Sequence, residues 1–255
     1  MNPRFTGKVV LIAGASEGIG RATASLMAAE GATIVAVARS EARLASLAEE
    51  LSATGGGSQM IVADCEDETA VKEVVSKVLQ TWGRIDVLVN SIGGSTVIKN
   101  SVALIEEMTL ADFERVVHFN LVPTFLMCKY VGPVMKAQGS GKIVNMSSLA
   151  SRGETQSSGA YSAAKAGIIA FTRKLSRELG PWGVNCNAIS PALVLTDRIN
   201  RTVGAVSAEV NAERIKNIPL RRHSMPEDQA RVVAFLASSD ADMITGVTID
   251  VAGGL

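Results

Sequence analysis

The sequence predicts an α/β fold in which helices cover both faces of a doubly wound, mostly parallel sheet of seven strands. Seven short runs are almost continuously apolar, as is typical of strands buried on both faces of a parallel sheet. Longer amphipathic stretches separate these runs, and this alternation produces βαβ units. The chain has 255 residues and shows no linker or internal repeat, so we expect a single domain over residues 1–255.

The individual elements follow from apolar periodicity and from glycines at the positions where helices should stop. The strands are expected at residues 9–13, 33–38, 60–63, 87–90, 142–146, 184–189 and 247–251. The helices are expected at residues 18–30, 41–53, 67–81, 110–137, 160–179 and 226–237. Glycine favours the position that follows a helix, and it occurs in that place at residues 31, 55–57, 83, 139 and 183.

One irregular segment, residues 193–219, lies between the sixth expected strand and the last helix. It is polar and partly helical, and it begins just after the carboxyl end of a strand. Ligands bind at that edge of a doubly wound sheet. We therefore expect this insert to be a short helical lid over a substrate site, inside the same domain.

The composition excludes several functional classes. The 25 Lys and Arg residues balance 25 Asp and Glu residues, which argues against a general binder of nucleic acid or of membrane surfaces. No apolar run reaches the roughly 20 residues that a membrane span needs. Cys65, Cys128 and Cys186 are far apart, so we interpret them as packing residues of a cytoplasmic protein. No metal-ligand spacing occurs, and we expect no metal.

A glycine-rich turn follows the first expected strand and opens the first helix. It reads G-A-S-E-G-I-G from Gly14 to Gly20, which differs from the strict G-x-G-x-x-G spacing. Glycines permit a tight turn and close approach of the backbone, and the N-terminus of a helix favours pyrophosphate. We interpret the segment as a Rossmann-like dinucleotide-binding turn, the alternative being a tight turn without a ligand. The expected contacts are Gly14, Ser16, Gly18, Ile19 and Gly20.

The end of the second expected strand favours NADP(H) over NAD(H). Dinucleotide folds usually place a carboxylate about 20 residues after the glycine turn to bind the ribose 2′-hydroxyl. Residues 37–40 instead read V-A-R-S. The Arg39 guanidinium can bind a 2′-phosphate with two hydrogen bonds, and Ser16 can add a hydroxyl. Glu17 argues against NADP(H) because its negative charge would repel the phosphate. The alternative for Arg39 is an ordinary solvated surface charge.

Three residues further along the chain suggest acid–base chemistry. Tyr161 and Lys165 are separated by one helical turn and share a face. A neighbouring cation favours the phenolate, so we expect Lys165 to lower the pKa of Tyr161 from its usual value of about 10. Ser148 lies at the end of a strand, where its hydroxyl can reach the mouth of the sheet. Because strand side chains alternate, Ser147 is expected to face the opposite way.

Together these residues resemble the short-chain dehydrogenase/reductase family, in its single-domain branch of about this length, over nearly the whole chain. The glycine turn is similar to the family's T-G-x-x-x-G-x-G motif, with Ala13 in place of threonine. N-S-I-G at residues 90–93 is similar to N-N-A-G, and P-A-L-V-L-T at residues 191–196 is similar to P-G-x-x-x-T. The further cofactor positions that the resemblance implies are Asp64 with its neighbour Cys65, Asn90, Gly93, Pro191, Val194 and Thr196.

The resemblance implies an NADP(H)-dependent carbonyl reductase or alcohol dehydrogenase that transfers hydride between nicotinamide and its substrate. Ser148 would hold the substrate oxygen, Tyr161 would exchange a proton with it, and Lys165 would also bind the nicotinamide ribose. Asn120 would complete the catalytic set by holding a water that links Lys165 to solvent. Asp64 would contact adenine, whereas Val194 and Thr196 would contact the nicotinamide amide.

The resemblance also implies a homotetramer whose interfaces use the helices at residues 110–137 and 160–179. Two alternatives to carbonyl chemistry stay open, namely imine or enoyl reduction on the same fold and a cofactor-binding regulator without turnover. The three-residue gap between Tyr161 and Lys165 counts against enoyl reductases, which usually leave six. Gly139 and Trp182 occupy positions where reductases of carrier-bound substrates commonly carry basic residues, which makes a carrier-protein substrate the weaker expectation.

The remaining candidates are one arginine and the two histidines of the chain. Arg152 lies between Ser148 and Tyr161 and is a hypothetical partner for an anionic substrate group, the alternative being a solvated loop charge. His118 is interpreted as a packing residue, and His223 as a surface residue, so neither is expected to be catalytic.

Overall fold

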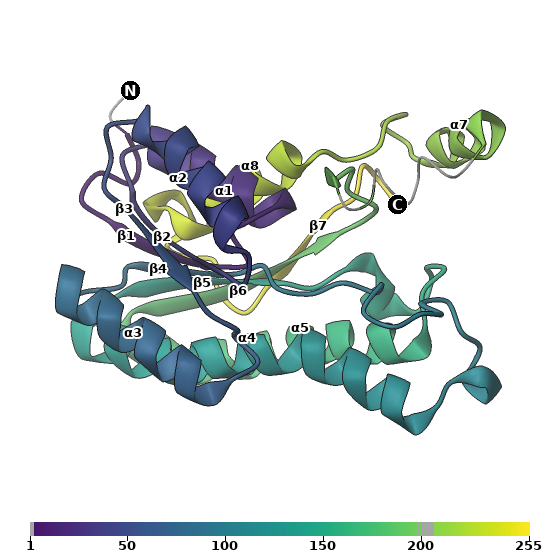
Figure 1. Ribbon diagram of the computed structural model, residues 1–255, viewed down its shortest axis with the longest axis horizontal. Helices are drawn as coiled ribbons and strands as arrows, with labels where there is room; N and C mark the ends of the chain where they lie inside the picture. The colour runs from purple at the N-terminus through teal and green to yellow at the C-terminus, as the bar shows by residue number, and fades with distance from the viewer. Residues whose placement is uncertain (1–2, 198, 200–206) are drawn as a thin grey trace.

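The computed structural model describes residues 3–197, 199 and 207–255. Its centre is a sheet of seven strands in the order β3-β2-β1-β4-β5-β6-β7, and every neighbouring pair is parallel (Figure 1). The strands are β1 Val9–Ala13, β2 Thr33–Ala38, β3 Ser58–Val62, β4 Val87–Asn90, β5 Gly141–Met146, β6 Val184–Pro191 and β7 Thr248–Val251. The strand order reverses between β1 and β4, and ligands bind at such a switch point.

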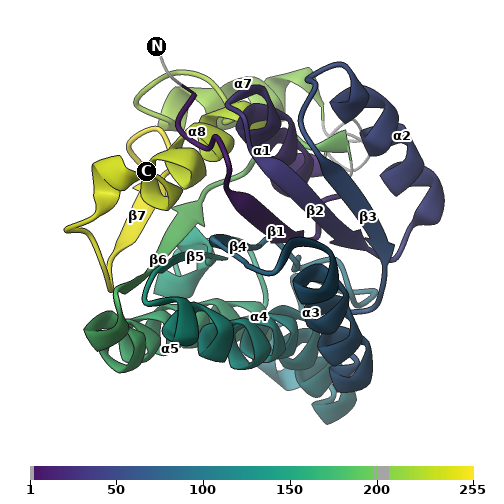
Figure 2. The same cartoon turned by 90° about the vertical axis from the view of Figure 1, so that its left-hand side faces the viewer.

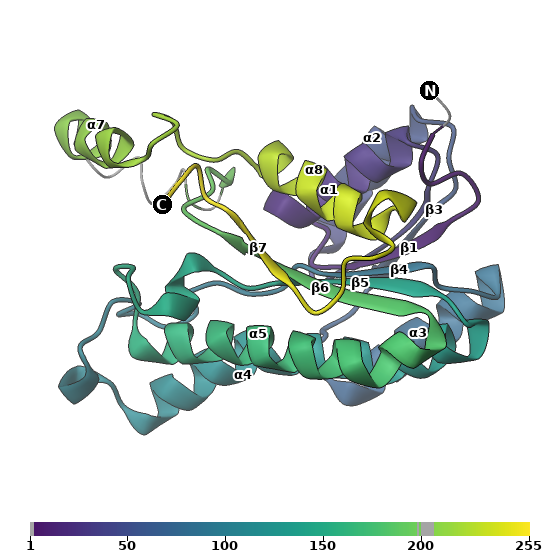
Figure 3. The same cartoon turned by 180° about the vertical axis from the view of Figure 1, so that it is seen from behind.

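Helices cover the sheet in two layers. The helices are α1 Gly18–Ala29, α2 Glu41–Ser52, α3 Glu68–Trp82, α4 Leu110–Gln138, α5 Gly159–Leu179, α7 Ala208–Asn217 and α8 Pro226–Ala237. The short 3-10 turns are η1 Ile105–Glu107, η2 Leu149–Arg152, η3 Gly180–Trp182 and η4 Ser239–Ala241. Figure 2 shows α1, α2 and α8 on one face and α3, α4 and α5 on the other. Helix α7 stands apart from both layers (Figure 3).

Local sequence determines where the helices that carry the site begin and end. Asp67 Oδ1 accepts hydrogen bonds from the first turn of α3, and Thr109 and Ser158 do the same for α4 and α5. Such caps satisfy backbone N–H groups that have no partner within the helix. Gly139 ends α4 in the left-handed conformation, which glycine adopts without a steric cost. The Ser158 cap therefore places Tyr161 in the first turn of α5.

Alternating side chains of the strands build two apolar cores. On β1, Val10 and Ile12 pack into the core beneath α1, α2 and α8, whereas Val9, Leu11 and Ala13 pack into the core over α3, α4 and α5. This division follows from the two-residue period of a strand. All five residues are buried, so the sheet is covered on both faces, as its continuous apolar runs predict.

The predicted α/β architecture is confirmed, and the sheet is wholly rather than mostly parallel. Strands β1, β2 and β4 have the predicted bounds, and β6 extends two residues further, through Pro191. The insert at residues 193–219 contains α7, and its residues 198 and 200–206 lie outside the described part of the chain. Within the described part, no helix has the length and apolar character that crossing a bilayer demands.

Two methionines allow a test of stability, because one lies in the core over α3, α4 and α5 and the other lies on the surface. Met127 on α4 is 0 % exposed, whereas Met243 is 97 % exposed. We expect Met127→Ala to lower the free energy of unfolding by about 2–5 kcal/mol, because it removes packed atoms and leaves a cavity. Met243→Ala should change it by less than about 0.5 kcal/mol. Urea denaturation followed by circular dichroism measures both, and equal losses would contradict the packing described here.

Candidate active site

Two adjoining hollows open at the carboxyl ends of the strands. The larger has a volume of about 780 Å³ and is lined by Ser148, Tyr161 and Lys165 together with residues that follow β6. The smaller has a volume of about 230 Å³ and is lined by the glycine turn, Arg39 and Asp64. The residues that line both hollows are Ile19, Ser91, Ile92, Gly93 and Thr196. A single elongated ligand can therefore extend from one hollow into the other.

The glycine positions of the turn have no room for side chains. A Cβ atom on Gly14 would lie 2.7 Å from the carbonyl oxygen of Ser91, and one on Gly20 would lie 2.2 Å from the carbonyl oxygen of Gly14. Gly14 also has a φ of +83°, which side chains disfavour. The turn thus exposes backbone N–H groups at the start of α1, which suits the pyrophosphate of a dinucleotide. These features fit the predicted cofactor-binding turn.

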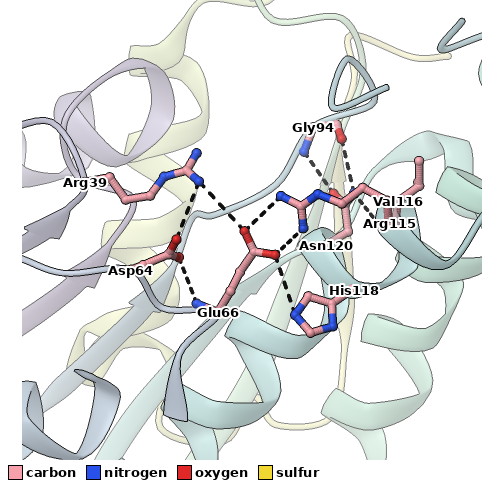
Figure 4. A network of polar contacts seen from close by, with 8 residues as sticks. All are labelled: Arg39, Asp64, Glu66, Gly94, Arg115, Val116, His118 and Asn120. Carbon is pink, nitrogen blue, oxygen red and sulfur yellow. Dashed lines mark hydrogen bonds and ion pairs between the residues drawn. The ribbon is translucent and has the colours of Figure 1, made fainter. Parts of the chain in front are cut away.

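Charged residues from three segments surround Glu66 beside the smaller hollow (Figure 4). Arg39, after β2, lies 3.7 Å from Asp64 and 3.8 Å from Glu66. Arg115 on α4 donates two hydrogen bonds to Glu66, one of them at 3.0 Å, and His118 Nε2 lies 3.6 Å from the same carboxylate. Sequence reasoning missed Glu66. The signals that could have identified Glu66 are Asp64, two residues earlier, and the three-residue spacing of Arg115 and His118, which places them on one helix face.

His118 was interpreted as a packing residue, and this interpretation is wrong. Its side chain is 51 % exposed, because its position on α4 faces Glu66 at the edge of the cofactor hollow rather than the sheet. Glu17, which was expected to oppose a phosphate, forms an ion pair with Arg43 at 2.5 Å. Its negative charge is therefore balanced by a cation of α2.

Tyr161 and Lys165 line the larger hollow on one face of α5. Lys165 is 3 % exposed, its Nζ donates to the carbonyl oxygen of Met146 at 2.9 Å, and it lies 5.7 Å from the centre of the Tyr161 ring. Ser148 is half-buried and its Oγ accepts a hydrogen bond from the Ala150 N–H at 3.2 Å. The Ser147 hydroxyl is instead buried and donates to the carbonyl oxygen of Lys165 at 2.9 Å.

Asn120 holds the loop after β4 against α4. Its Oδ1 accepts from the Gly94 N–H at 2.9 Å, and its Nδ2 donates to the carbonyl oxygens of Gly94 and Val116 at 3.1 and 2.9 Å. A Cβ atom on Gly93 would lie 2.7 Å from Asn120 Oδ1 and 2.8 Å from Lys165 Nζ. The structure therefore brings Asn120 and Lys165 together across Gly93, although the Asn120 side chain does not line either hollow.

The remaining predicted residues divide between lining and support. Pro191, Val194 and Thr196 line the larger hollow, and Ser16, Gly18 and Cys65 line the smaller one. Burial raises the pKa of the Cys65 thiol to about 12, so the thiol is uncharged near neutral pH. All three cysteines are buried and free, as the packing interpretation predicts.

Asn90 supports the sheet instead of lining the hollows. Its Nδ2 donates to Asn145 Oδ1 at 2.8 Å, and Asn145 donates in turn to Thr172 Oγ1 at 2.9 Å. This buried polar chain links β4 and β5 to α5 directly beneath the site. Asn145 and Thr172 were missed by sequence reasoning because isolated polar residues within apolar runs carry no distinctive spacing.

The larger hollow continues to α7, to the segment before α8 and to the first turn of α8, which together form its far end. Arg214, Arg222, His223 and Asp228 line it. The expectation that His223 is a surface residue is wrong, because it is 7 % exposed and Nε2 lies 2.8 Å from Asn211 Oδ1 on α7. Burial, with the nearby positive charge of Arg214, lowers the pKa of His223. The hydrogen-bonded guanidinium of Arg222 lowers the pKa of Asp228 to about 2.

Arg152 does not line the larger hollow. Its guanidinium instead forms an ion pair with Asp250 on β7. The hypothesis that Arg152 meets an anionic substrate group therefore loses its structural basis, because both the position and the charge of Arg152 are used elsewhere.

These features define an oxidoreductase-type dinucleotide fold, and comparisons with known proteins agree. A family model described as enoyl-(acyl carrier protein) reductase matches residues 14–255. A 3-oxoacyl-[acyl-carrier-protein] reductase of Thermotoga maritima is 37% identical over 99% of both chains. A 7alpha-hydroxysteroid dehydrogenase of Bacteroides fragilis is 33% identical over 99% of this chain and 95% of that protein.

Solved structures show the same relationship. A 3-oxoacyl-[acyl-carrier protein] reductase of Brucella melitensis with bound NAD is 34% identical, with a TM-score of 0.89 over 100% of this chain and 93% of the other. Levodione reductase is 33% identical, with a TM-score of 0.90 over 98% of both chains. The present chain belongs to the short-chain dehydrogenase/reductase family and is an NAD(P)-dependent oxidoreductase.

The close packing at Gly93 supplies a test of the site's geometry. We expect Gly93→Ala to lower kcat by about a hundredfold, because its Cβ must displace Lys165 Nζ or Asn120 and small displacements at a reacting centre have effects of that size. Gly159→Ala is the matched control, since a Cβ there meets no atom within 4 Å. Steady-state kinetics with NADPH and a ketone measures both variants. Equal activities would show that the contact at Gly93 is unimportant.

Proposed function

We propose that this protein is an NADP(H)-dependent carbonyl reductase or alcohol dehydrogenase in which Tyr161 is the acid–base residue. One observation carries this proposal. The hollow that adjoins the glycine turn is lined by Ser148, Tyr161 and Lys165 together. The bound nicotinamide would supply or accept the hydride. The residues of the chain then need only bind, orient and protonate the substrate oxygen.

Each of the three residues has a distinct proposed role. The Ser148 hydroxyl holds the substrate oxygen, and the Tyr161 hydroxyl donates a proton to that oxygen in reduction or removes it in oxidation. The positive charge of Lys165 near the Tyr161 ring favours the phenolate. Lys165 also binds the nicotinamide ribose. Asn120 supports this arrangement through its hydrogen bonds to Gly94, and it would help to link Lys165 to solvent through a water.

The proposed preference for NADP(H) depends on Arg39. Its side chain is 60 % exposed, and its two carboxylate neighbours lie 3.7 and 3.8 Å away, beyond hydrogen-bond length. Glu66 is held more closely by Arg115. A 2′-phosphate can therefore draw Arg39 away from its carboxylate neighbours while Arg115 keeps Glu66 neutralised. Asp64, which lines the same hollow, would contact the adenine.

A carrier-bound acyl substrate is the second candidate, because two of the relatives are reductases of acyl-carrier-protein substrates. The exposed Trp182 and the uncharged Gly139 weaken it, since they stand where basic docking residues would be expected. Imine reduction and a regulatory role without turnover are further alternatives. We also propose a cytoplasmic homotetramer that uses α4 and α5 as interfaces, which sedimentation at micromolar concentration tests directly.

The chain's two tyrosines provide a controlled test of the acid–base assignment. We expect Tyr161→Phe to lower kcat by about 10²–10⁴-fold, because it removes the proton-transferring hydroxyl. Tyr130→Phe removes a hydroxyl that instead contacts Glu68 on the surface, and it should keep kcat within about twofold of the parent enzyme. Turnover of a ketone with NADPH measures both. Unchanged turnover in Tyr161→Phe would reject the assignment.

Arg39 can be tested with the two cofactors as mutual controls. Arg39→Leu should raise KM for NADPH about tenfold to a hundredfold, because a hydrogen bond to a charged group contributes about 1.5–3 kcal/mol. KM for NADH, which lacks the 2′-phosphate, should change little. A parent enzyme that prefers NADH, or a variant in which both KM values rise equally, would overturn the preference for NADP(H).

A further inference from the structure

The far end of the larger hollow carries an unbalanced positive charge. The charged side chains that line the hollow as a whole are Lys165, Arg214, Arg222 and Asp228. Arg222 is committed to Asp228, to which it donates hydrogen bonds of 2.6 and 2.9 Å. Lys165 belongs to the proposed catalytic group. Arg214 on α7 is therefore the cation of this end whose charge is not matched by a described carboxylate.

The surroundings of Arg214 support this assignment. Within the described part of the chain, no carboxylate lies within ion-pair distance of Arg214. Its neighbour Glu213 is paired with Lys216 at 3.2 Å. The residues outside the described part contain neither Asp nor Glu in their sequence. A cation that lines a hollow without a partner is a binding group for an anion.

A second observation comes from His223 beside it. His223 is 7 % exposed, and its Nδ1 is buried without a hydrogen-bond partner among the described residues. Nε2 contacts the Asn211 amide. If that amide is turned end for end, Nε2 accepts a hydrogen bond and the ring hydrogen lies on Nδ1, where it can be donated. Because Nδ1 is buried, a ligand oxygen bonds to it only when the ring shifts toward the hollow that His223 lines, and that bond would remove the cost of a buried polar atom without a partner.

Aliphatic side chains also line this hollow, with Leu193, Ile218 and Leu220 among them. We propose, building on the carbonyl chemistry proposed above, that the substrate is an aliphatic oxo acid or hydroxy acid whose carboxylate binds Arg214 and His223. Its carbon chain lies along the aliphatic wall, and its oxo group reaches Ser148 and Tyr161. The carboxylate thereby aligns the molecule with the oxo end at the proton-transferring residues.

The test compares oxo acids with their methyl esters, which differ in charge. A series from 4-oxopentanoate to 8-oxononanoate covers the unknown chain length. For the best acid, we expect Arg214→Met to lower kcat/KM by about tenfold to a hundredfold, while its ester changes by less than about twofold. Arg214→Lys should recover part of the loss because it restores the charge. Lys216→Met is the matched control, since it removes a cation from α7 that does not line the hollow.

Several results would overturn the proposal. The proposal fails if the parent enzyme turns over the esters as well as the acids, or if Arg214→Met lowers kcat/KM equally for acid and ester. It also fails if Lys216→Met lowers kcat/KM for the acid as much as Arg214→Met does. Tyr161-dependent turnover of the esters in any of these cases leaves the proposed function intact. If neither acids nor esters react, turnover of other ketones with NADPH tests the proposed function separately. Titration calorimetry with hexanoate and hexanamide then decides the carboxylate site, which requires hexanoate to bind more tightly and Arg214→Met to abolish the difference.

Discussion

The site depends on the close approach of three backbone segments where the strand order reverses. Gly14 lies against the carbonyl of Ser91, Gly20 lies against Gly14, and Gly93 lies against Lys165 and Asn120. Any side chain at these positions would separate β1, α1 and the loop after β4. Because both hollows share the loop that contains Gly93, this packing sets the position of the nucleotide-binding turn relative to the residues on α5.

The buried polar groups beneath the site serve the same end. Asn90, Asn145 and Thr172 form a hydrogen-bonded chain from β4 through β5 to α5, and Ser147 bonds to the backbone of α5. Buried polar groups that are paired in this way favour one arrangement of the core over others. They fix the register of α5 against β5, and so the distance between the strand end that carries Ser148 and the helix that carries Tyr161 and Lys165.

Much of this could be predicted from the sequence, because the signals were local. Apolar runs with a strand's length, capping residues and glycines defined the elements, and the four-residue separation of Tyr161 and Lys165 identified a shared helix face. What escaped prediction depends on long-range contacts. His223 reads as a surface residue in an Arg-rich segment, yet the approach of α7 buries it. Arg152 reads as a free cation until β7 brings Asp250 beside it.

Glu66 illustrates a different consequence of the fold. Its carboxylate lies between Arg39 near the end of β2 and Arg115 and His118 on α4. The charge of Glu66 therefore interacts both with a residue of the cofactor hollow and with a long helix. Substitutions among residues in one such network are expected to be non-additive. A change at Arg39 alters the charge balance that α4 experiences, and a change at Arg115 alters the field around the nucleotide. Evolution of cofactor choice in this chain would therefore tend to proceed through correlated exchanges across β2, the segment after β3 and α4.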